Sequence, residues 1–550
     1  MDYIVGVKYT HDSAVALIQG DKLVFSVEGE KINNNVRYKA ADDLNFAQEV
    51  MFMMGANYPL PNKGIISVDG WREPVLGLPV APYAGYDADA VKKYQGVNYV
   101  SYPHVTGHII GSYVTAPFSG YKVPAAVVTW DGGQVPRLDI VHPDGQVKIR
   151  HIANLLCFKG YIYGIMGYYA GPFKNELVIN GTLKNEIGKP LLHTHGVPGK
   201  LMSYIALGKP NRNLVEAAHD IYADVERFFY NNKDDLIDPT KRGFPEHRFM
   251  QKMKFASDVL LLSDADLLAT VHQFLEEKLV ERIKAIIPPN MPLIFTGGSA
   301  LNIKWNTALV ESGHFNDVWV SPFPNDAGSA IGAAACVAAL ENNVWSLNWS
   351  AYCGPDLIEN GVPADWLEAD MSPFELGSFI GHNENEAVVT LYGRSEIGPR
   401  ALGHRSLLMS PVTRQAKSFL NMVKKREDWR PVAPICLYED AYKAFKLVKA
   451  DRFMLYDHVI KNEWKEKIPA IVHIDDTARV QVVTKQDSAF VNEVLEGFKS
   501  ISGFGILCNT SANYNGRGFF PDAMSAATWA SENGVNYVWA NGILYTKVVK

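Results

Sequence analysis

Two stretches of the chain share one pattern of apolar and polar positions. Residues 2–31 show three apolar segments separated by a polar turn and by Gln19-Gly20-Asp21, which predicts three strands. Residues 124–152 repeat this pattern, with Asp131-Gly132-Gly133 after the first segment and Asp144-Gly145 before the third. The recurrence predicts two halves of one duplicated fold.

Helical patterns occur between and after these strands. Apolar residues recur at helical spacing over 263–287, with Lys and Glu on the other face, and residues 327–340 are rich in Ala and Gly, as in a tightly packed internal helix. Residues 292–302 predict an apolar strand, a turn at Gly297-Gly298 and a helix, a geometry in which backbone can approach a ligand closely. Because strands and helices alternate, the predicted fold class is α/β.

The length of the chain predicts more than one domain. A chain of 550 residues is about three to four times a typical domain length. From about Trp345 to Glu384 the sequence is irregular and rich in Asn, Gly, Pro and Trp, which is typical of a connection. We therefore predict domains at residues 1–345 and 385–550, joined by residues 346–384.

Composition narrows the class of protein. Apolar residues at 47% and charged residues at 20% exclude a disordered or collagen-like chain, and a net charge of −6 disfavours a protein that wraps nucleic acid. The five cysteines include no CxxC pair, which excludes a zinc ribbon and indicates reduced thiols. No apolar stretch is long enough to span a bilayer, and the N-terminus lacks signal-peptide features. These features predict a cytoplasmic protein, or one of the host cytoplasm if a phage encodes it, with no membrane partner.

Two histidines and two aspartates are candidate metal ligands. His104 and His108 are four residues apart, so on a helix both imidazoles lie on one face, where a single metal can bridge them. Asp131 follows an apolar strand and Asp326 opens the Ala-rich helix, so each carboxylate could be held near one crevice. Mixed ligation by His and carboxylate suits iron, manganese or zinc. The alternatives are a structural histidine pair and, for Asp326, a helix cap.

His11 is a candidate general base. It lies in the first polar turn, His11-Asp12-Ser13, and a duplicated α/β fold brings the corresponding turns of its halves together over a cleft. A neutral histidine there could accept a hydroxyl proton. The alternative is a histidine that caps the turn.

Basic residues gather in the second predicted domain. The residues that form this group fall within 37 positions interrupted by Gly and Pro: Arg394, Arg400, Arg405, Lys424, Lys425, Arg426 and Arg430. This grouping predicts a fixed pocket for several phosphate groups, whereas a solvated basic face would contain more Glu. Asn509, Thr510 and Ser511 follow the apolar strand 503–508 and could present amide and hydroxyl groups to the same anion.

Taken together, ten ordered motifs resemble a known family. They are HDS at 11–13, VEGEK at 27–31, HVTGH at 104–108, VTWDGG at 128–133, GKLMSYIALG at 199–208, TGGSALN at 296–302, PNDAGSAIG at 324–332, EIGPRALGHRS at 396–406, KKREDWRPVAP at 424–434 and CNTSAN at 508–513. Over nearly its whole length the chain resembles the O-carbamoyltransferases of tobramycin, cephamycin and nodulation-factor synthesis. The resemblance implies an N-terminal actin-like domain of the ASKHA type, similar to the threonylcarbamoyl-transfer domain, and a C-terminal YrdC-like domain.

The resemblance also implies a reaction in two steps. The YrdC-like domain would use carbamoyl phosphate and ATP with Mg²⁺, form carbamoyl adenylate and release phosphate and pyrophosphate. The N-terminal domain would then transfer the carbamoyl group to the hydroxyl of a small molecule or nucleotide. The expected enzyme is a carbamoyltransferase, and a homodimer is compatible with it.

Residue roles follow from the same resemblance. The implied catalytic residues are His11, Lys424 and Arg430. The implied metal, Fe²⁺ or another divalent transition metal, would be held by His104, His108, Asp131 and Asp326, with Gly297, Gly298 and Asn302 near the nucleoside. The groups implied to bind carbamoyl phosphate and ATP are Arg400, Arg405, Lys424, Arg430, Arg479, Asn509 and Ser511.

Three alternatives stay open at this point. The first keeps the chemistry but carbamoylates a hydroxymethylated pyrimidine nucleotide or DNA base, as phage base modification would require. The second is a tRNA threonylcarbamoyl-modification enzyme, which the EIGPRALG motif disfavours. The third is a non-catalytic actin-like nucleotide switch, which the density of basic residues disfavours.

Overall fold

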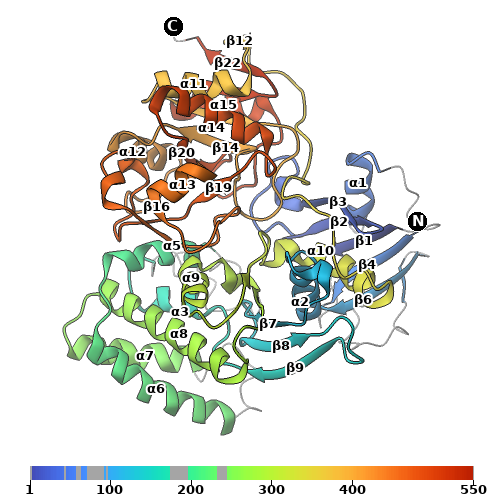
Figure 1. The fold of residues 1–550 in the computed structure, drawn as a ribbon, viewed down its shortest axis with the longest axis vertical. Coiled ribbons are helices and arrows are strands. Elements are labelled where there is room, and N and C mark those ends of the chain that lie inside the picture. Colours follow the sequence, from blue (N-terminus) through green and yellow to red (C-terminus); the bar gives the residue numbers. More distant parts are fainter. Residues whose placement is uncertain are drawn as a thin grey trace, which may run out of the picture. The chain divides into compact units, whose positions relative to one another are not determined.

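The chain contains two compact units, and Figure 1 labels their helices and strands. Unit 1 comprises Met1–Val123, Pro143–Lys148 and Val320–Lys550, and unit 2 comprises Pro124–His142 and Ile149–Trp319. The computed structural model describes residues 3–41, 45–56, 64–70, 92–94, 97–173, 196–231 and 245–548. Both units combine sheets with helices, which confirms the α/β class. The domain boundaries expected at 345 and 385 stay a prediction.

The first sheet of unit 1 has the strand order β3-β2-β1-β4-β6-β5. Strands β1, β2 and β3 form an antiparallel meander, and β4 and β6 continue the sheet in parallel with β1. Helix α10 (Ser329–Cys336) packs so closely on β1 that a Cβ added at Gly6 would lie 1.9 Å from the Ala330 carbonyl oxygen. The strands are β1 (Tyr3–Lys8), β2 (Ala14–Gln19), β3 (Lys22–Glu28), β4 (Gly64–Gly70), β5 (Lys92–Tyr94) and β6 (Val97–Pro103).

Unit 2 repeats this topology in a sheet of order β11-β10-β7-β8-β9. Strands β7, β8 and β9 form an antiparallel meander, and β10 pairs in parallel with β7, as β4 does with β1. The predicted duplication is therefore confirmed. The strands are β7 (Ala125–Thr129), β8 (Arg137–Val141), β9 (Ile149–Asn154), β10 (Leu293–Thr296) and β11 (Val318–Trp319).

The described part of unit 2 also contains α-helices. The helix expected over 263–287 is α8 (Asp264–Ile286), and it begins where the Ser263 hydroxyl accepts a hydrogen bond from the Asp266 backbone N–H in a capping box. The others are α3 (Ile162–Tyr169), α5 (Val197–Tyr204), α6 (Arg212–Asn231), α7 (Pro245–Val259) and α9 (Ile303–Glu311).

The C-terminal part of unit 1 has its own sheet, of order β12-β22-β21-β13-β14-β20-β15-β19. Its strands are β12 (Trp366–Asp370), β13 (Ala387–Leu391), β14 (Arg405–Met409), β15 (Ala433–Leu437), β19 (Gln481–Val483), β20 (Ile506–Ser511), β21 (Tyr537–Ala540) and β22 (Ile543–Lys547). Its helices are α11 (Pro373–His382), α12 (Arg414–Val423), α13 (Tyr438–Ala444), α14 (Ala489–Ser502) and α15 (Ala523–Asn533). A smaller sheet consists of β16 (Phe445–Lys446), β17 (His458–Ile460) and β18 (Thr477–Ala478).

The expectation of irregular structure up to Glu384 was wrong for residues 366–382. Strand β12 pairs with β22, and α11 packs on α14, where Cβ atoms added at Gly377 or Gly497 would each lie 1.9 Å from a carbonyl oxygen of the other helix (Figure 1). Strand β12 escaped detection because only its first residue is buried, which leaves no apolar alternation to read.

The directions of the strands bring three loops with basic residues to one edge of the C-terminal sheet. These are the loops that lead into β14, β15 and β19. Strand β20 runs antiparallel to both β14 and β15, so its end at Ser511 lies beside the starts of these strands, with Ser406 opposite Ser511 and Ala433 opposite Asn509. Strand β19 is parallel to β15, which places Arg479, just before β19, at the same edge.

Among the helices that the structure describes, none combines the length and the apolar character needed to cross a membrane.

Candidate functional site

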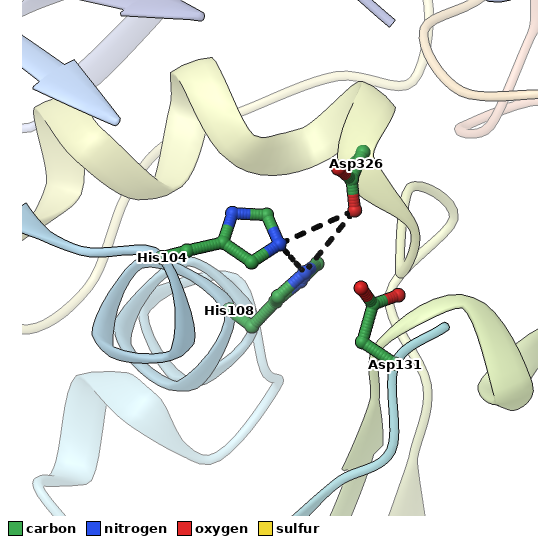
Figure 2. A group of neighbouring side chains, drawn as sticks. All are labelled: His104, His108, Asp131 and Asp326. Carbon is green, nitrogen blue, oxygen red and sulfur yellow. Dashed lines mark hydrogen bonds and ion pairs between the residues drawn. The ribbon is translucent and has the colours of Figure 1, made fainter. Parts of the chain in front are cut away.

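The two histidines and Asp326 meet inside unit 1. Helix α2 (His104–Val114) begins directly after β6 and places His104 and His108 one turn apart, with their Nε2 atoms 3.0 Å apart (Figure 2). Asp326 begins the short helix η7 (Asp326–Gly328) ahead of α10, and its Oδ1 lies 3.3 Å from His104 Nε2 and 3.6 Å from His108 Nε2. Unit 1 therefore presents two imidazole nitrogens and one carboxylate oxygen to a common point.

These distances fit a shared metal ion. Ligand atoms bonded to one ion at about 2.1 Å lie roughly 3 Å apart when the bonds are at right angles. All three side chains are buried, and two imidazoles with a carboxylate form a donor set that divalent iron, manganese or zinc accepts.

Asp69, at the end of β4, holds His104 in a fixed orientation. Both of its carboxylate oxygens lie 3.0 Å from His104 Nδ1, so Nδ1–H donates to Asp69 and the lone pair of Nε2 is left for a metal. Burial alone would raise the pKa of Asp69, but His104 and Lys8 lower it to about 2. Sequence reasoning missed Asp69, because a single Asp after the apolar run GIISV carries no motif.

Lys8 forms ion pairs with both Asp69 and Asp326. Its buried Nζ lies 2.9 Å from Asp326 Oδ2 and 3.3 Å from Asp69 Oδ2. Burial would lower the pKa of Lys8, but the two carboxylates raise it above its usual value, and Lys8 in turn helps to hold the pKa of Asp326 well below the ordinary range against the effect of burial. Asp326 is thus ready to act as an anionic ligand.

His11 lies at the edge of the same group. Its Nδ1 is 3.0 Å from Asp12 Oδ2, and its Nε2 is 3.6 Å from Asp326 Oδ2. Burial opposes the charged form, but Asp12 and Asp326 outweigh this effect and raise the pKa of His11. The side chain keeps 30% of its surface exposed, so a molecule in solvent can reach it.

In unit 2 the structure brings Asp131 together with the Gly-Gly turn. Asp131 follows β7, and its Oδ1 accepts a hydrogen bond of 2.8 Å from the Gly298 backbone N–H. Gly297 has a φ of 87°, and a Cβ there would lie 2.6 Å from the Trp130 carbonyl carbon, so this glycine lets the turn pack on the end of β7. Asn302 caps α9 with its Oδ1 and donates from Nδ2 to the Tyr163 hydroxyl. The nucleoside role of Gly297, Gly298 and Asn302 and the place of Asp131 in a ligand set stay predictions.

A cluster of cations, in which a buried lysine lies with four partly buried arginines, is found at the edge of the C-terminal sheet. We call it the basic cluster: Arg400, Lys424, Arg426, Arg430 and Arg479. Burial and the neighbouring guanidinium of Arg479 lower the pKa of Arg400 well below its usual value, and burial lowers that of Arg479 to about 10 although Asp451 opposes the shift. The Nε atoms of Arg400 and Arg479 are buried and have no hydrogen-bond partner among the described residues. Buried like charges with unused donors are costly unless an anion binds among them.

Lys424 and Arg426 lie beside the end of β20. Lys424 Nζ donates to the Ser511 and Asn513 carbonyl oxygens at 2.8 and 2.6 Å and to Asn513 Oδ1 at 2.6 Å, so its charge is fixed in place. Arg426 Nη1 donates to Thr510 Oγ1 at 3.0 Å, and burial with the neighbouring Arg430 lowers the pKa of Arg426 to about 9.

Asparagine and serine at the end of β20 complete this edge. Asn509 donates from Nδ2 to the Ala401 carbonyl oxygen at 3.1 Å, and its buried Oδ1 has no partner among the described residues. Ser511 donates from Oγ to Asn513 Oδ1 at 2.6 Å.

Arg405 has other partners in the structure than the basic cluster, and its role in binding carbamoyl phosphate and ATP stays a prediction. Its buried guanidinium donates to the carbonyl oxygens of Tyr392, Gly393 and His404. Burial lowers the pKa of Arg405 to about 10, although the negative charge of Glu396 opposes the shift. The residue lies at the start of β14, where the side chain satisfies backbone carbonyls. Arg394 is likewise bound to carbonyl oxygens of Val24, Cys353 and Gly354, and Lys425 is exposed.

Comparison with known proteins places the chain in a family. Residues 3–93 and 65–336 match the profile described as Carbamoyltransferase N-terminus, and residues 382–547 match Carbamoyltransferase C-terminus. Nodulation protein U of Rhizobium tropici is 38% identical over 99% of this chain and 96% of its own length. The 3'-hydroxymethylcephem-O-carbamoyltransferase of Amycolatopsis lactamdurans is 30% identical over 97% of each chain.

Among solved structures, the activator of the 2-hydroxyisocaproyl-CoA dehydratase from Clostridium difficile matches with 12% identity and a TM-score of 0.33, over 64% of this chain and 100% of its own.

The profiles and the full-length relatives define a transferase enzyme. The chain belongs to the carbamoyltransferase family. The predicted family and the prediction of an enzyme are confirmed, and the interpretation as a non-catalytic switch is set aside.

Proposed function

We propose that the chain is an ATP-dependent O-carbamoyltransferase that works in two steps. In the first, carbamoyl phosphate, ATP and water give carbamoyl adenylate, phosphate and pyrophosphate at the basic cluster. In the second, an acceptor hydroxyl attacks the carbamoyl carbon, the bond to AMP breaks, and the carbamate ester, AMP and a proton are formed.

The basic cluster carries the proposal for the first step. Carbamoyl phosphate and the ATP triphosphate bring several negative charges, and buried guanidinium groups bind phosphate oxygens through paired, charge-assisted hydrogen bonds. The unused Nε donors of Arg400 and Arg479 suit these oxygens, and Mg²⁺ would accompany ATP. An anion would also relieve the mutual repulsion that, after burial, lowers the pKa values of these groups.

The histidine cluster supports the second step. We propose that His104, His108 and Asp326 hold a divalent transition metal, Fe²⁺ in the first instance, with Asp131 as a predicted further ligand. When bound, the metal would act as a Lewis acid toward the phosphate of the leaving AMP. Asp69 fixes the tautomer of His104, and Lys8 keeps Asp326 anionic.

His11 is proposed to remove the acceptor proton. Its Nδ1 faces Asp12, so Nε2 is the nitrogen that would accept the hydroxyl proton as the new C–O bond forms. Only neutral imidazole can do this, and Asp12 would stabilise the imidazolium that results.

The acceptor is proposed to carry a free hydroxyl. The cephem relative is named for carbamoylation at a hydroxymethyl group, which supports O-transfer as the common reaction. A small molecule and a hydroxymethylated nucleotide both offer this group.

Pyrophosphate release tests the first step. The purified chain with Mg²⁺, ATP and carbamoyl phosphate should release pyrophosphate without any acceptor, and omission of either substrate should abolish the release. Release that needs bicarbonate and threonine instead of carbamoyl phosphate would contradict the proposal and favour the tRNA-modification alternative.

A further inference from the structure

The segment that follows β3 lies along the C-terminal part of unit 1. We call residues 29–41 the strap. The Arg37 backbone N–H donates to the Gly516 carbonyl oxygen at 2.9 Å, the Gly518 N–H donates to the Asn35 carbonyl oxygen at 2.9 Å, and Val36 forms an antiparallel bridge with Arg517. A Cβ added at Gly518 would lie 1.9 Å from the Glu30 carbonyl oxygen. The strap is therefore held by backbone contacts to residues 516–518, directly beyond β20.

A buried ion pair fixes the start of the strap to the loop that carries Arg400. Lys31 Nζ donates to Glu28 Oε1 at 2.8 Å and to the Glu396 and Gly398 carbonyl oxygens at 2.7 and 2.8 Å. Glu28 Oε1 in turn accepts a hydrogen bond of 2.7 Å from the Gly398 N–H. These bonds place a short rigid connection between β3 and the loop that leads to Arg400.

Arg37 is a cation of the strap within electrostatic reach of the basic cluster. Its positive charge lowers the pKa values of Arg400, Lys424 and Arg426, beside the larger effect of burial. Its Nε is buried and has no hydrogen-bond partner within the described part of the chain. Its acidic neighbour Glu30 accepts a hydrogen bond from the Tyr38 N–H. A guanidinium on a segment whose backbone is fixed, with an unused buried donor near other cations, is placed to bind an anion.

We infer that Arg37 binds a phosphate group of the substrates of the first step, so that the N-terminal segment of the chain completes the binding site in the C-terminal part. The inference rests on the proposed function. Phosphate is offered by both carbamoyl phosphate and ATP, and the hydrogen bonds that fix the strap make the Arg37 guanidinium a preorganised donor for it.

Ligand binding to the full chain tests the inference. Calorimetric titration with carbamoyl phosphate alone and with ATP and Mg²⁺ alone should show binding weakened about 10- to 100-fold in Arg37→Met for one or both ligands. Weakening for carbamoyl phosphate alone would assign Arg37 to that phosphate, and weakening for ATP alone would assign it to the triphosphate. Arg37→Lys, which keeps the charge without the fork, should lie between Arg37→Met and the wild type.

Arg517→Met is the matched control. It removes an equal charge from the same region and a 3.3 Å hydrogen bond to the Asn34 carbonyl oxygen of the strap, but Arg517 is not among the main causes of the pKa shifts of Arg400, Lys424 and Arg426. Its affinities should stay within about 3-fold of the wild type. Equal affinities in Arg37→Met, Arg37→Lys and the wild type, at unchanged melting temperature, would overturn the inference and leave the proposed function intact. A wild-type chain that binds neither ligand would contradict the proposed function itself.

Discussion

At the scale of single residues, Lys424 differs from its neighbour Lys425 in burial and in contacts. The Lys424 ammonium is enclosed and bound to Ser511 and Asn513, whereas Lys425 faces solvent. Lys424→Ala should lower carbamoyl-phosphate-dependent pyrophosphate release by about 100-fold or more, because it removes a fixed charge and frees the end of β20. Lys425→Ala, measured in the same assay, should retain nearly full activity, and equal effects of the two changes would exclude the assigned role.

Asp69 should control metal affinity without touching the metal. Asp69→Asn keeps the size of the side chain but weakens its hold on His104 Nδ1–H, and a change of this kind commonly costs 10- to 100-fold in metal affinity. The measurement is metal bound per chain after dialysis against buffers of defined free Fe²⁺ or Zn²⁺. Asp139→Asn is the control, because Asp139 is also buried and ion-paired, but with Arg137 in unit 2. Equal metal affinity in both variants would exclude the proposed role of Asp69 in orienting His104 for metal binding.

Sequence patterns predicted which candidate site residues lie near one another better than they predicted which groups each side chain contacts. The spacing of His104 and His108 indicated a shared face, and the structure brings both to Asp326. The partners of Arg405 were not predictable, because a sequence shows a positive charge but not the carbonyl oxygens that surround it. Arg37 was missed because its partners follow more than 350 positions later in the chain.

At the scale of elements, two glycines allow two effects on the free energy of unfolding to be distinguished. One is the strain of a positive φ, and the other is the steric clash of an added Cβ with neighbouring backbone. Gly297, between β10 and η6 (Gly298–Leu301), has a φ of 87° and packs against Trp130, whereas Gly313 has a φ of 61° and open space around it. Gly313→Ala should lower the free energy of unfolding by about 1 kcal/mol. Gly297→Ala should lower it by about 2–4 kcal/mol, because the added methyl group also meets backbone. Denaturant titrations measure both, and equal losses would contradict the packing role of the turn.

The start of α14 should make stability sensitive to acid. His404 Nδ1 is 2.8 Å from the Arg394 carbonyl oxygen, and Nε2 is 3.1 Å from the hydroxyl of Ser488, the N-cap of α14, a pattern that suits neutral imidazole. Burial lowers the pKa of His404 from 6.5 to about 4. The unfolded chain therefore binds this proton first, so the stabilisation is present above pH 6.5 and is lost as the pH falls toward 4.

His404→Gln measures this contribution. Between pH 7 and pH 5 the wild type should lose about 2 kcal/mol more of its free energy of unfolding than the variant does. Parallel dependence of the two proteins on pH would contradict a neutral, buried His404.

Elements with a regular pattern were predictable, and those fixed by distant partners were not. The strands of both meanders alternate with turns that contain Gly and Asp, and α8 begins at a capping box visible as Ser263 and Asp266. Strand β12 is exposed along most of its length, so its place beside β22 depends on pairing that no local pattern records.

At the scale of the whole molecule, unit 1 combines segments from both ends of the chain. Strands β1 to β6 and the sheet β12 to β22 share this unit, and the strap connects β3 to the loops of the basic cluster. Under the proposed two-step reaction, contacts of this kind would give a physical reason for keeping both steps on one chain, since the N-terminal segment lies against the loops of the proposed activation site.

The central claim is that activation and transfer are separate steps at separate groups of residues. Its most direct test is quantification of carbamoyl adenylate by mass spectrometry in reactions with ATP, carbamoyl phosphate and Mg²⁺ but no acceptor, for the wild type and for His108→Ala. We predict that both proteins form carbamoyl adenylate with an equal amount of pyrophosphate, and that the variant binds less metal. Absence of carbamoyl adenylate and pyrophosphate from the wild-type reaction would contradict the account.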